Sequence, residues 1–492
     1  MRRLLIALTL AGAALRFGTL DLQSFWFDES VTVRLVGDDL FGMLGHIPDS
    51  ESTPPLYYVL AWLWSRLFGT GEIGLRSLSA LAGTATVPIA YSAAERLVSR
   101  RTGLAVAALA AFSPLLVWYS QEARSYALLV LLGAMSLYAF ARLLRRPDRR
   151  GACLWAGASA LALATHYFAV FLVAPEALWL MLRARRPGTG AAVAGVAAVG
   201  LALLPLAIHQ GSLDLASFID ESSFGDRLLQ VPKQLLVGYD LPVEVLLASV
   251  AGVVALAGAA LAVRRMTSEH SPGLEAATGI GVVALVAPAL VAVAGADYLL
   301  TRNLLAAWLP LMTVVAAGLL SVRRGEAAVA LLCVAGIAGV IGTAVEPRWQ
   351  RDDWRGVVDA LGPAETPRAV VITPADSGIA PFLLYDRNAE RVTQAGVTVS
   401  EVALVSTRGR RGSGTHPPAP PRPTRPAFPG FNLVRREYAD DFTVIVFARP
   451  RPVHLPPSTL AAYRLLSSGA GGLLLQRPVS GAAGRARRPP GG

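Results

Sequence analysis

Residues 100–146 contain two apolar runs enclosed by arginine pairs: RRTGLAVAALAAFSPLLVWYSQEARSYALLVLLGAMSLYAFARLLRR. The runs cover 103–119 and 125–142, and a short polar stretch with Glu122 and Arg124 joins them. Each run approaches the roughly 20 residues that a helix needs to cross a bilayer. Because arginines mark the cytoplasmic ends of membrane helices, this stretch predicts a helical hairpin whose polar turn faces the outside.

The composition extends this interpretation to most of the chain. Hydrophobic residues make up 53% of the sequence, charged residues make up 16%, and the mean hydropathy is +0.49. This is more apolar surface than a soluble domain could bury, so we expect a polytopic membrane protein rather than a soluble enzyme. The net charge of +11 lies in short clusters between apolar runs and not on one patch. It therefore indicates topology and not a nucleic-acid partner.

Apolar runs predict about eleven membrane helices. They lie at residues 4–20, 76–97, 103–119, 125–142, 152–165, 168–182, 190–208, 236–262, 276–296, 303–320 and 327–345. Basic clusters occupy every second connection: Arg2-Arg3, Arg96 with Arg100-Arg101, Arg145-Arg146 with Arg149-Arg150, Arg183 with Arg185-Arg186, Arg264-Arg265 and Arg323-Arg324. A cytoplasmic N-terminus places all of them inside. The same orientation places the 209–235 loop and everything after Val345 on the outer side of the membrane. The residues that it also places there are Asp28, Glu29, Glu122, His166, Asp297 and Arg302.

Three segments allow a second interpretation. Residues 54–68 are apolar, but about 15 residues are too few to cross, so we expect an interfacial helix. The runs 152–165 and 168–182 could form one long helix through His166; we favour a hairpin, which keeps the flanking arginines on one side. The N-terminal run could be a signal peptide, but we expect an uncleaved first helix.

The composition changes after residue 345. Strand-like runs occur at 369–373, 401–406, 442–448 and 472–476, and a helical pattern near 353–361 precedes them. We therefore expect an all-α membrane domain at 1–345 and a small α/β extracytoplasmic domain at 346–477. A Pro-rich insertion at 408–430 interrupts the small domain, and a disordered tail is expected at 478–492.

Two adjacent carboxylates follow an aromatic run in Ser24-Phe25-Trp26-Phe27-Asp28-Glu29-Ser30. Charge close to lipid is costly, so it usually has a partner or a function. The plainer interpretation is that Asp28 and Glu29 begin a helix, whose N-terminus favours negative charge. Glu122 and Arg124 recur at the outer end of another helix. Together these residues indicate one site on the outer side.

Four motifs resemble, in order, the N-terminal module of the C-type membrane glycosyltransferases, which include protein O-mannosyltransferases and bacterial lipid A aminoarabinose transferases. The similarity covers roughly residues 15–180, and 297–310 resembles a later family segment with an arginine near the outer face. The motifs are Phe27-Asp28-Glu29-Ser30, Ser52-Thr53-Pro54-Pro55-Leu56-Tyr57-Tyr58, Gly69-Thr70-Gly71-Glu72-Ile73-Gly74-Leu75-Arg76 and Tyr119-Ser120-Gln121-Glu122-Ala123-Arg124-Ser125-Tyr126.

The resemblance implies transfer of a sugar from a polyprenyl-phosphate carrier to an acceptor outside the cytoplasmic membrane, generally with inversion. A general base must accept the proton of the attacking group, and the position of Asp28 matches the acidic residue of the family, with Glu29 beside it. The lipid phosphate leaves with negative charge, which Arg124 and Arg302 are suited to stabilise. Glu122 could orient the acceptor, hold Arg124, or bind Mg²⁺ or Mn²⁺ together with Asp28.

Further residues are assigned to substrate binding, each with a structural alternative. Glu51 would fill a secondary acidic position, and Tyr126 belongs to the fourth motif. A lone histidine such as His166 is more often a hydrogen-bonded structural residue than a catalyst. Tyr57 and its aromatic neighbours could line a groove for lipid or sugar, although an interfacial belt is the slightly favoured explanation.

Two other classes of function compete with a transferase. A transporter or flippase of lipid-linked saccharides would also have many helices, but such proteins commonly show paired halves with polar sites near the midplane, whereas here the candidate charges cluster at one face and we find no internal repeat. An inactive scaffold would have no need of the acidic motifs. The predicted cytoplasmic side carries no Gly-rich phosphate loop. This favours a lipid-linked sugar donor over a nucleotide-linked sugar donor. The sequence leaves open whether the acceptor is protein, lipid or polysaccharide, and acceptor recognition is a natural role for the C-terminal domain.

Overall fold

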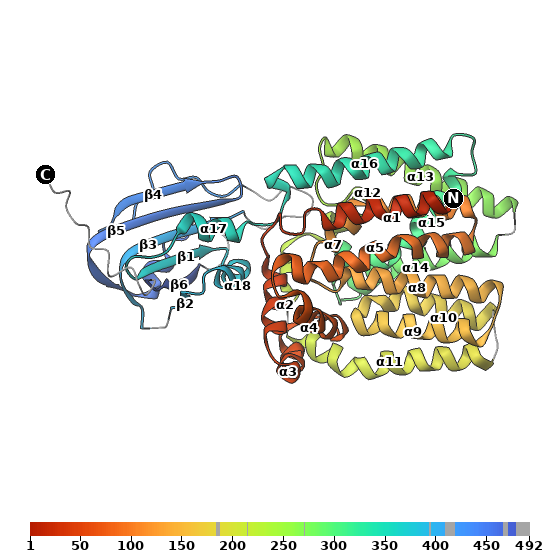
Figure 1. Ribbon diagram of the computed structural model, residues 1–492, viewed down its shortest axis with the longest axis horizontal. Helices are drawn as coiled ribbons and strands as arrows, with labels where there is room; N and C mark the ends of the chain where they lie inside the picture. Colours follow the sequence, from red (N-terminus) through yellow and green to blue (C-terminus); the bar gives the residue numbers. More distant parts are fainter. Residues whose placement is uncertain are drawn as a thin grey trace. The chain divides into compact units, whose positions relative to one another are not determined.

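The computed structural model describes residues 1–183, 187–213, 215–269, 271–392, 395–408, 419–465 and 471–478. The chain divides into two compact units. The helical unit comprises Met1–Leu22 and Thr32–Val345, and the C-terminal unit comprises Gln23–Val31 with the described residues from Glu346 onward. Figure 1 shows long helices in the first and a β-sheet in the second.

Long helices lie side by side in the helical unit (Figure 1). The α-helices from the N-terminus to the end of this unit are α1 (Arg2–Phe17), α2 (Phe27–Gly37), α3 (Leu40–Ser50), α4 (Leu56–Phe68), α5 (Glu72–Leu97), α6 (Arg100–Phe112), α7 (Pro114–Ser120), α8 (Tyr126–Arg145), α9 (Arg149–Thr165), α10 (Val170–Arg183), α11 (Pro187–Ser212), α12 (Phe224–Val237), α13 (Glu244–Ser268), α14 (Pro272–Val293), α15 (Trp308–Leu319) and α16 (Gly325–Val345). Short 3-10 helices are η1 (Tyr167–Ala169), η2 (Ser217–Glu221) and η3 (Thr301–Ala307). The predicted mainly helical architecture is confirmed.

Among the described residues, seven helices are long and apolar enough to cross a membrane. They are α5, α8, α11, α13, α14, the η3–α15 segment and α16. An eighth follows if α6 and α7, which meet at a bend of 56°, form one span. Each of the eleven predicted segments is helical, but α1, α9 and α10 have only 16, 17 and 14 residues. The number of crossings therefore stays a prediction.

A reversal of the chain at His166 supports the predicted hairpin. Trp155 Nε1 on α9 donates a hydrogen bond of 2.8 Å to Glu176 Oε2 on α10. One continuous helix would place these two residues about 30 Å apart, because each residue advances a helix by 1.5 Å. The alternative of a single long helix through His166 is therefore excluded.

Glu176 forms a buried polar cluster that the apolar pattern of α10 conceals. Its side chain is fully buried, and its Oε2 accepts hydrogen bonds from Trp155 of α9 and from the Ser136 hydroxyl of α8. Ser136 in turn lies 2.8 Å from the Ser159 hydroxyl. A carboxyl group buried among apolar helices is costly unless it is hydrogen-bonded, so this cluster joins α8, α9 and α10 at one defined register.

Arg16 holds the bend between α6 and α7. Pro114 has no N–H to donate to the carbonyl oxygen of Ala110, and Arg16 Nη2 donates to that oxygen instead, at 2.9 Å. Arg16 Nη1 donates to the neighbouring carbonyl oxygen of Ala111 at 3.1 Å. The guanidinium thus satisfies carbonyl groups at the end of α6, where the chain turns toward the Glu122-Arg124 stretch.

Helix α4 confirms a short helix in the segment predicted to be interfacial. Its 13 residues span about 20 Å, which is less than a bilayer core. Tyr57 and Tyr58 are completely buried, whereas Trp62 and Trp64 are half-buried. The belt interpretation is therefore wrong for the two tyrosines, because neighbouring segments of the protein cover them. Placement of α4 at a membrane surface stays a prediction.

In the described part of the C-terminal unit, six strands form one sheet in the order β2-β6-β1-β3-β5-β4. Their bounds are β1 (Arg368–Thr373), β2 (Ala389–Arg391), β3 (Val397–Thr407), β4 (Asn432–Tyr438), β5 (Phe442–Leu455) and β6 (Gly472–Gln476). Only β1 and β3 pair in parallel; the other neighbours are antiparallel. The four predicted strands correspond to β1, β3, β5 and β6. The two that were missed are the three-residue β2 and the edge strand β4, which is largely exposed and lacks a buried apolar pattern.

Helices complete the two cores of this sheet. Trp354, Val357 and Leu361 of α17 (Trp354–Leu361) pack on one face, together with Phe382 of α18 (Ala375–Tyr385). Leu460 of α19 (Pro457–Ala461) packs on the other face. Helix α17 confirms the pattern near 353–361. Of the predicted Pro-rich insertion, 409–418 lie outside the described residues, as does the predicted tail from 479.

We expect Glu176→Ala to destabilise the helical unit by about 1–3 kcal/mol, because the indole N–H of Trp155 and the hydroxyl of Ser136 would be left buried without this acceptor. The midpoint of thermal unfolding in detergent measures the effect. Glu269→Ala is the matched control, because the Glu269 side chain is 66% exposed. Equal shifts for the two variants would contradict a structural role for the cluster.

Candidate active site

A buried ion pair between Arg124 and Glu51 lies at the centre of the candidate site. Arg124 follows α7 in the turn before α8, and Glu51 terminates α3. The two guanidinium nitrogens Nη1 and Nη2 donate to the two carboxylate oxygens at 2.7 Å each. Only 7% and 3% of the two side chains are exposed, so water screens this pair little. The structure thus joins two of the predicted residues, 73 positions apart.

Polar groups from α2 and α4 complete the surroundings of the pair. Arg124 Nη1 also donates to Thr32 Oγ1 at 3.4 Å, and the Arg124 guanidinium lies 5.7 Å from the ring centre of Tyr58. The Tyr58 hydroxyl lies 3.1 Å from that of Thr53. Burial raises the pKa of Tyr58 well above its usual range, so its hydroxyl keeps its proton. Tyr58 is therefore a neutral hydrogen-bonding group beside the ion pair.

The backbone that carries Arg124 is fixed from two sides. Ser79 Oγ of α5 donates to the carbonyl oxygen of Arg124, and the Tyr57 hydroxyl lies 3.4 Å from Ser79 Oγ. Gln121 Nε2 donates to the Leu15 carbonyl oxygen at 2.9 Å and to Thr19 Oγ1 at 2.7 Å. Tyr57, predicted to bind substrate, thus contacts the support of Arg124 through Ser79.

A row of aromatic rings runs from the α7 turn toward the segment that carries Arg302. The ring of Tyr126 lies 4.7 Å from that of Tyr119 and 5.8 Å from that of His166. Beyond His166 the row continues through Phe168 to Tyr298. At its other end, the hydroxyl of Tyr119 is hydrogen-bonded to that of Tyr239. Sequence analysis did not identify Tyr239, whose only local signal is its place in an aromatic and acidic loop.

His166 is neutral and lies within electrostatic range of the two predicted phosphate-binding arginines. It is 97% buried, and its Nδ1 accepts a hydrogen bond from the backbone N–H of Phe168, so the ring proton is on Nε2. Burial, with a smaller effect of the positive charges of Arg302 and Arg124, lowers the pKa of His166 from 6.5 to about 3. The histidine thus acts as a helix cap, and its Nε2–H is a donor and not a base.

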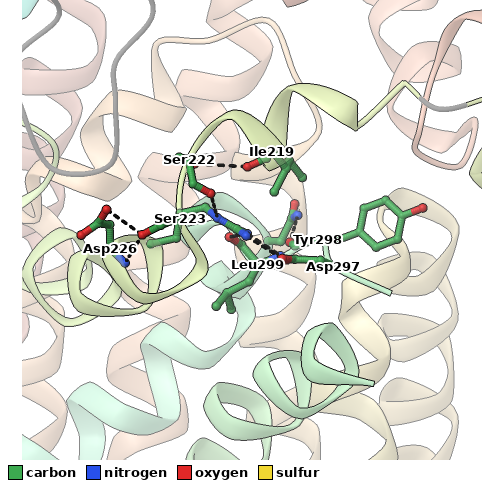
Figure 2. A network of polar contacts seen from close by, with 9 residues as sticks. Ile219, Ser222, Ser223, Asp226, Asp297, Tyr298 and Leu299 are labelled. Atoms are coloured by element: carbon green, nitrogen blue, oxygen red, sulfur yellow. Dashed lines mark hydrogen bonds and ion pairs between the residues drawn. The ribbon is translucent and has the colours of Figure 1, made fainter. Parts of the chain in front are cut away.

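A second ion pair, which sequence analysis missed, supports the loop that precedes Arg302. Arg227 of α12 donates to both carboxylate oxygens of Asp297, at 2.8 Å to Oδ1, and to the carbonyl oxygen of Leu299 at 3.0 Å. Figure 2 shows this network around Asp297, Tyr298 and Leu299. The partially exposed Arg302 follows in η3, with its guanidinium 5.3 Å from the ring centre of Phe218. The fork of Arg227 thus fixes the loop before Arg302.

Glu122 is 1% exposed and lies in the same turn as Arg124. The backbone N–H of Arg124 donates a hydrogen bond to the backbone carbonyl oxygen of Glu122. Tyr119 is within electrostatic range of both Glu122 and Arg302. The helical unit therefore gathers Glu51, Glu122, Arg124, Tyr126, His166 and Arg302 around the α7 turn. No group of three or more His, Cys, Asp or Glu residues suited to a metal ion occurs in the described part of the chain.

Asp28 and Glu29 belong to the C-terminal unit. Both lie in the first turn of α2, where negative charge is favourable. Glu29 is completely buried, whereas Asp28 is partly exposed. Of these two carboxylates, Asp28 is the one that a substrate could reach.

Arginines line a hollow of about 700 Å³ at the opposite end of α8, and Arg96, Arg142, Arg145 and Arg146 are among them. This end lies about 30 Å along α8 from Arg124, because the helix has 20 residues. The hollow therefore belongs to the basic clusters that predict the cytoplasmic side and not to the candidate site.

Comparisons with known proteins found one matching family and several solved structures of similar fold. Residues 52–209 match the family described as dolichyl-phosphate-mannose-protein mannosyltransferase. ArnT from Cupriavidus metallidurans superposes with a TM-score of 0.55 at 12% identity, over 90% of this chain and 97% of that chain. This chain has the fold of ArnT. The resemblance seen in the sequence motifs is confirmed.

Two other solved structures are similar over shorter stretches. The archaeal oligosaccharyltransferase AglB from Archaeoglobus fulgidus has a TM-score of 0.47 at 12% identity, over 72% of this chain and 57% of that chain. The Saccharomyces cerevisiae protein O-mannosyltransferase Pmt1-Pmt2 complex has a TM-score of 0.32 at 18% identity, over 45% and 33%. No curated protein sequence matched significantly.

We expect Glu51→Gln to destabilise this glycosyltransferase fold by about 3 kcal/mol, because it leaves the charge of Arg124 buried beside a neutral amide. Thermal unfolding in detergent tests this. The control is Glu95→Gln, which removes an ion pair to the 74% exposed side chain of Arg100 and should cost at most about 1 kcal/mol. A Glu51 variant no less stable than the control would refute the importance of the buried pair.

We expect the buried, neutral His166 to make the folded protein less stable in mild acid. The unfolded chain takes up a proton at His166 below a pKa of 6.5, but the folded protein does so only near 3, so stability falls as the pH falls between these values. Between pH 7 and pH 5 the loss is about 2 kcal/mol. His166→Asn keeps an acceptor for the Phe168 N–H and removes the titration. Its unfolding midpoint should therefore change less with pH than that of the wild type; parallel profiles would contradict the assignment.

Proposed function

We propose that this chain is an inverting glycosyltransferase that moves a sugar from a polyprenyl-phosphate carrier to an acceptor at the outer face of the cytoplasmic membrane. The observation that carries the proposal is the match of residues 52–209 to the mannosyltransferase family, because that segment contains the Glu122-Arg124 turn and His166. The fold shared with ArnT supports it. A structure of that ArnT contains undecaprenyl phosphate, a lipid phosphate of the proposed class.

Arg302 and Arg124 are the proposed binding groups for the carrier phosphate. When the bond between the anomeric carbon and the phosphate oxygen breaks, the electron pair stays on the phosphate, and positive charge lowers the energy of that state. Arg302 is the more exposed of the two and would contact the phosphate directly. Arg124 is engaged by Glu51 through two hydrogen bonds, so it would supply charge from a fixed position. Glu51 would thus act through Arg124.

Asp28 is the proposed general base. Its carboxylate would accept the proton of the acceptor hydroxyl or amine while that group forms a bond to the anomeric carbon from the face opposite the phosphate. Attack from that face inverts the anomeric configuration. Glu29, being buried, would support the first turn of α2 and not contact the acceptor. This partial exposure of Asp28 favours it over Glu29.

The remaining residues are proposed to orient the sugar and the acceptor. His166 would offer a neutral Nε2–H donor, and Tyr126 contributes the neighbouring ring. Tyr57 would act through the support of Arg124, and Glu122 would orient the acceptor. Asp28 and Glu122 would be the ligands if Mg²⁺ or Mn²⁺ takes part, which addition of a chelator to the assay would reveal.

We further propose that the N-terminus is cytoplasmic and that the C-terminal unit lies outside, because this orientation places every basic cluster between helices inside. The acceptor could be protein, lipid or polysaccharide. AglB has been solved with an inhibitory peptide and a dolichol-phosphate, which illustrates a peptide ligand on a related fold.

We expect Asp28→Asn to abolish release of free polyprenyl phosphate, because the amide cannot accept a proton. The assay uses purified protein in lipid with a panel of polyprenyl-phosphate sugars and a cell-envelope extract as acceptor. Asp49→Asn is the control: its side chain is 72% exposed and pairs with His209 in the helical unit, so release should persist. Movement of these lipids across the bilayer without release by the wild type would favour a transporter instead.

A further inference from the structure

Residues 23–25, which precede α2, are attached to the C-terminal domain by hydrogen bonds. Ser24 Oγ donates to the carbonyl oxygen of Asp352 and accepts from the backbone N–H of Trp354, both at 2.9 Å. One serine hydroxyl therefore uses its donor and an acceptor position on the same loop. The Ser24 side chain is 1% exposed, which keeps water from competing for these bonds.

Two further bonds flank the serine. Gln23 Oε1 accepts from the backbone N–H of Arg351 at 2.8 Å, and the Tyr385 hydroxyl accepts from the backbone N–H of Phe25 at 2.7 Å. Phe25 itself is buried. Three consecutive residues are thus bound by two separate parts of the domain, the loop before α17 and the end of α18.

The atoms that hold this segment are themselves rigidly supported. Trp354 is the first residue of α17 and is 1% exposed in the core beneath the sheet. Gly378 of α18 packs so closely against it that a Cβ atom there would lie 2.5 Å from the indole ring. Tyr385 is the last residue of α18 and packs against the same core. The core of the domain therefore determines where residues 23–25 lie.

Helix α2 begins directly after these residues. Its first backbone hydrogen bond joins the N–H of Ser30 to the carbonyl oxygen of Trp26, one residue beyond the anchored Phe25. Asp28 lies in this first turn. Because a helix is rigid along its axis, its anchored start determines the position of a carboxylate in its first turn. Misplacement of a catalytic group by about 1 Å can cost up to about 100-fold in rate.

We propose that the C-terminal domain is a positioning element for Asp28, with Ser24 and Tyr385 as its positioning residues. This inference rests on the proposed function and deepens it, because it gives the domain a part in turnover in addition to any part in acceptor recognition. Loss of either hydroxyl would leave the substrate-binding groups of the helical unit in place and loosen only the start of α2. The expected signature is a lower kcat with unchanged KM for donor and acceptor.

The test compares Tyr385→Phe and Ser24→Ala with a matched control in the same domain. Tyr438→Phe also removes a hydroxyl that makes a hydrogen bond, in this case to the carbonyl oxygen of Pro423. Two readouts are needed on the full-length protein in lipid: amide hydrogen exchange in the peptide containing residues 23–31, and steady-state kinetics. We expect faster exchange and a decrease in kcat of about tenfold for the two positioning variants, with KM values unchanged, and neither effect for the control.

Each contrary outcome has a distinct meaning. Unchanged exchange in both variants would overturn the anchoring itself. Faster exchange with unchanged kcat would overturn the positioning role. A raised acceptor KM with unchanged kcat would also overturn it, and would assign the domain to acceptor binding. A wild-type protein that transfers sugar from no donor would refute the proposed function, and the positioning role with it, while the exchange data would still report on the attachment of residues 23–25.

Discussion

Polar groups buried among apolar helices must find their hydrogen-bond partners inside the protein, and this requirement organises the helical unit. Arg16 donates to the carbonyl oxygens of Ala110 and Ala111 at the end of α6, the first of which Pro114 cannot satisfy because it has no N–H. Glu176 joins three helices through one carboxyl oxygen and its serine and tryptophan partners. These contacts are directional, whereas apolar helix packing tolerates sliding and rotation. They therefore define the register in which the helices carry their polar ends.

The candidate site depends on that register. The bend held by Arg16 leads into α7 and the turn with Arg124, and Glu51 reaches the same turn from α3. A guanidinium paired in this way keeps its charge, but its orientation is set before any substrate arrives. Arg302 is placed independently through Arg227 and Asp297. Two arginines on separate supports, with a neutral His166 within range of both charges, are the preorganised groups that we propose for the carrier phosphate.

The carboxylate that we propose as general base, Asp28, needs equally firm support, and the start of α2 is held by a different part of the chain. Ser24 and Tyr385 connect the start of this helix to a sheet domain more than 300 residues away in sequence. The proposed role of Asp28 requires that an acceptor can reach its carboxylate, which the fully buried Glu176 does not allow. A folded polar domain can hold such a group without burying it.

The sequence by itself determined the helical membrane architecture, four of the strands and the family resemblance, because apolar run length, period-two patterns and local motifs are properties of neighbouring residues. It also placed Glu122, Arg124 and His166 as candidates. The tertiary structure alone decided that Glu51 is the partner of Arg124, that Arg227 supports the Arg302 loop, and that residues 23–31 belong with the C-terminal domain. These pairings join residues far apart in the chain, and their partners are selected by packing and burial, which no local pattern encodes.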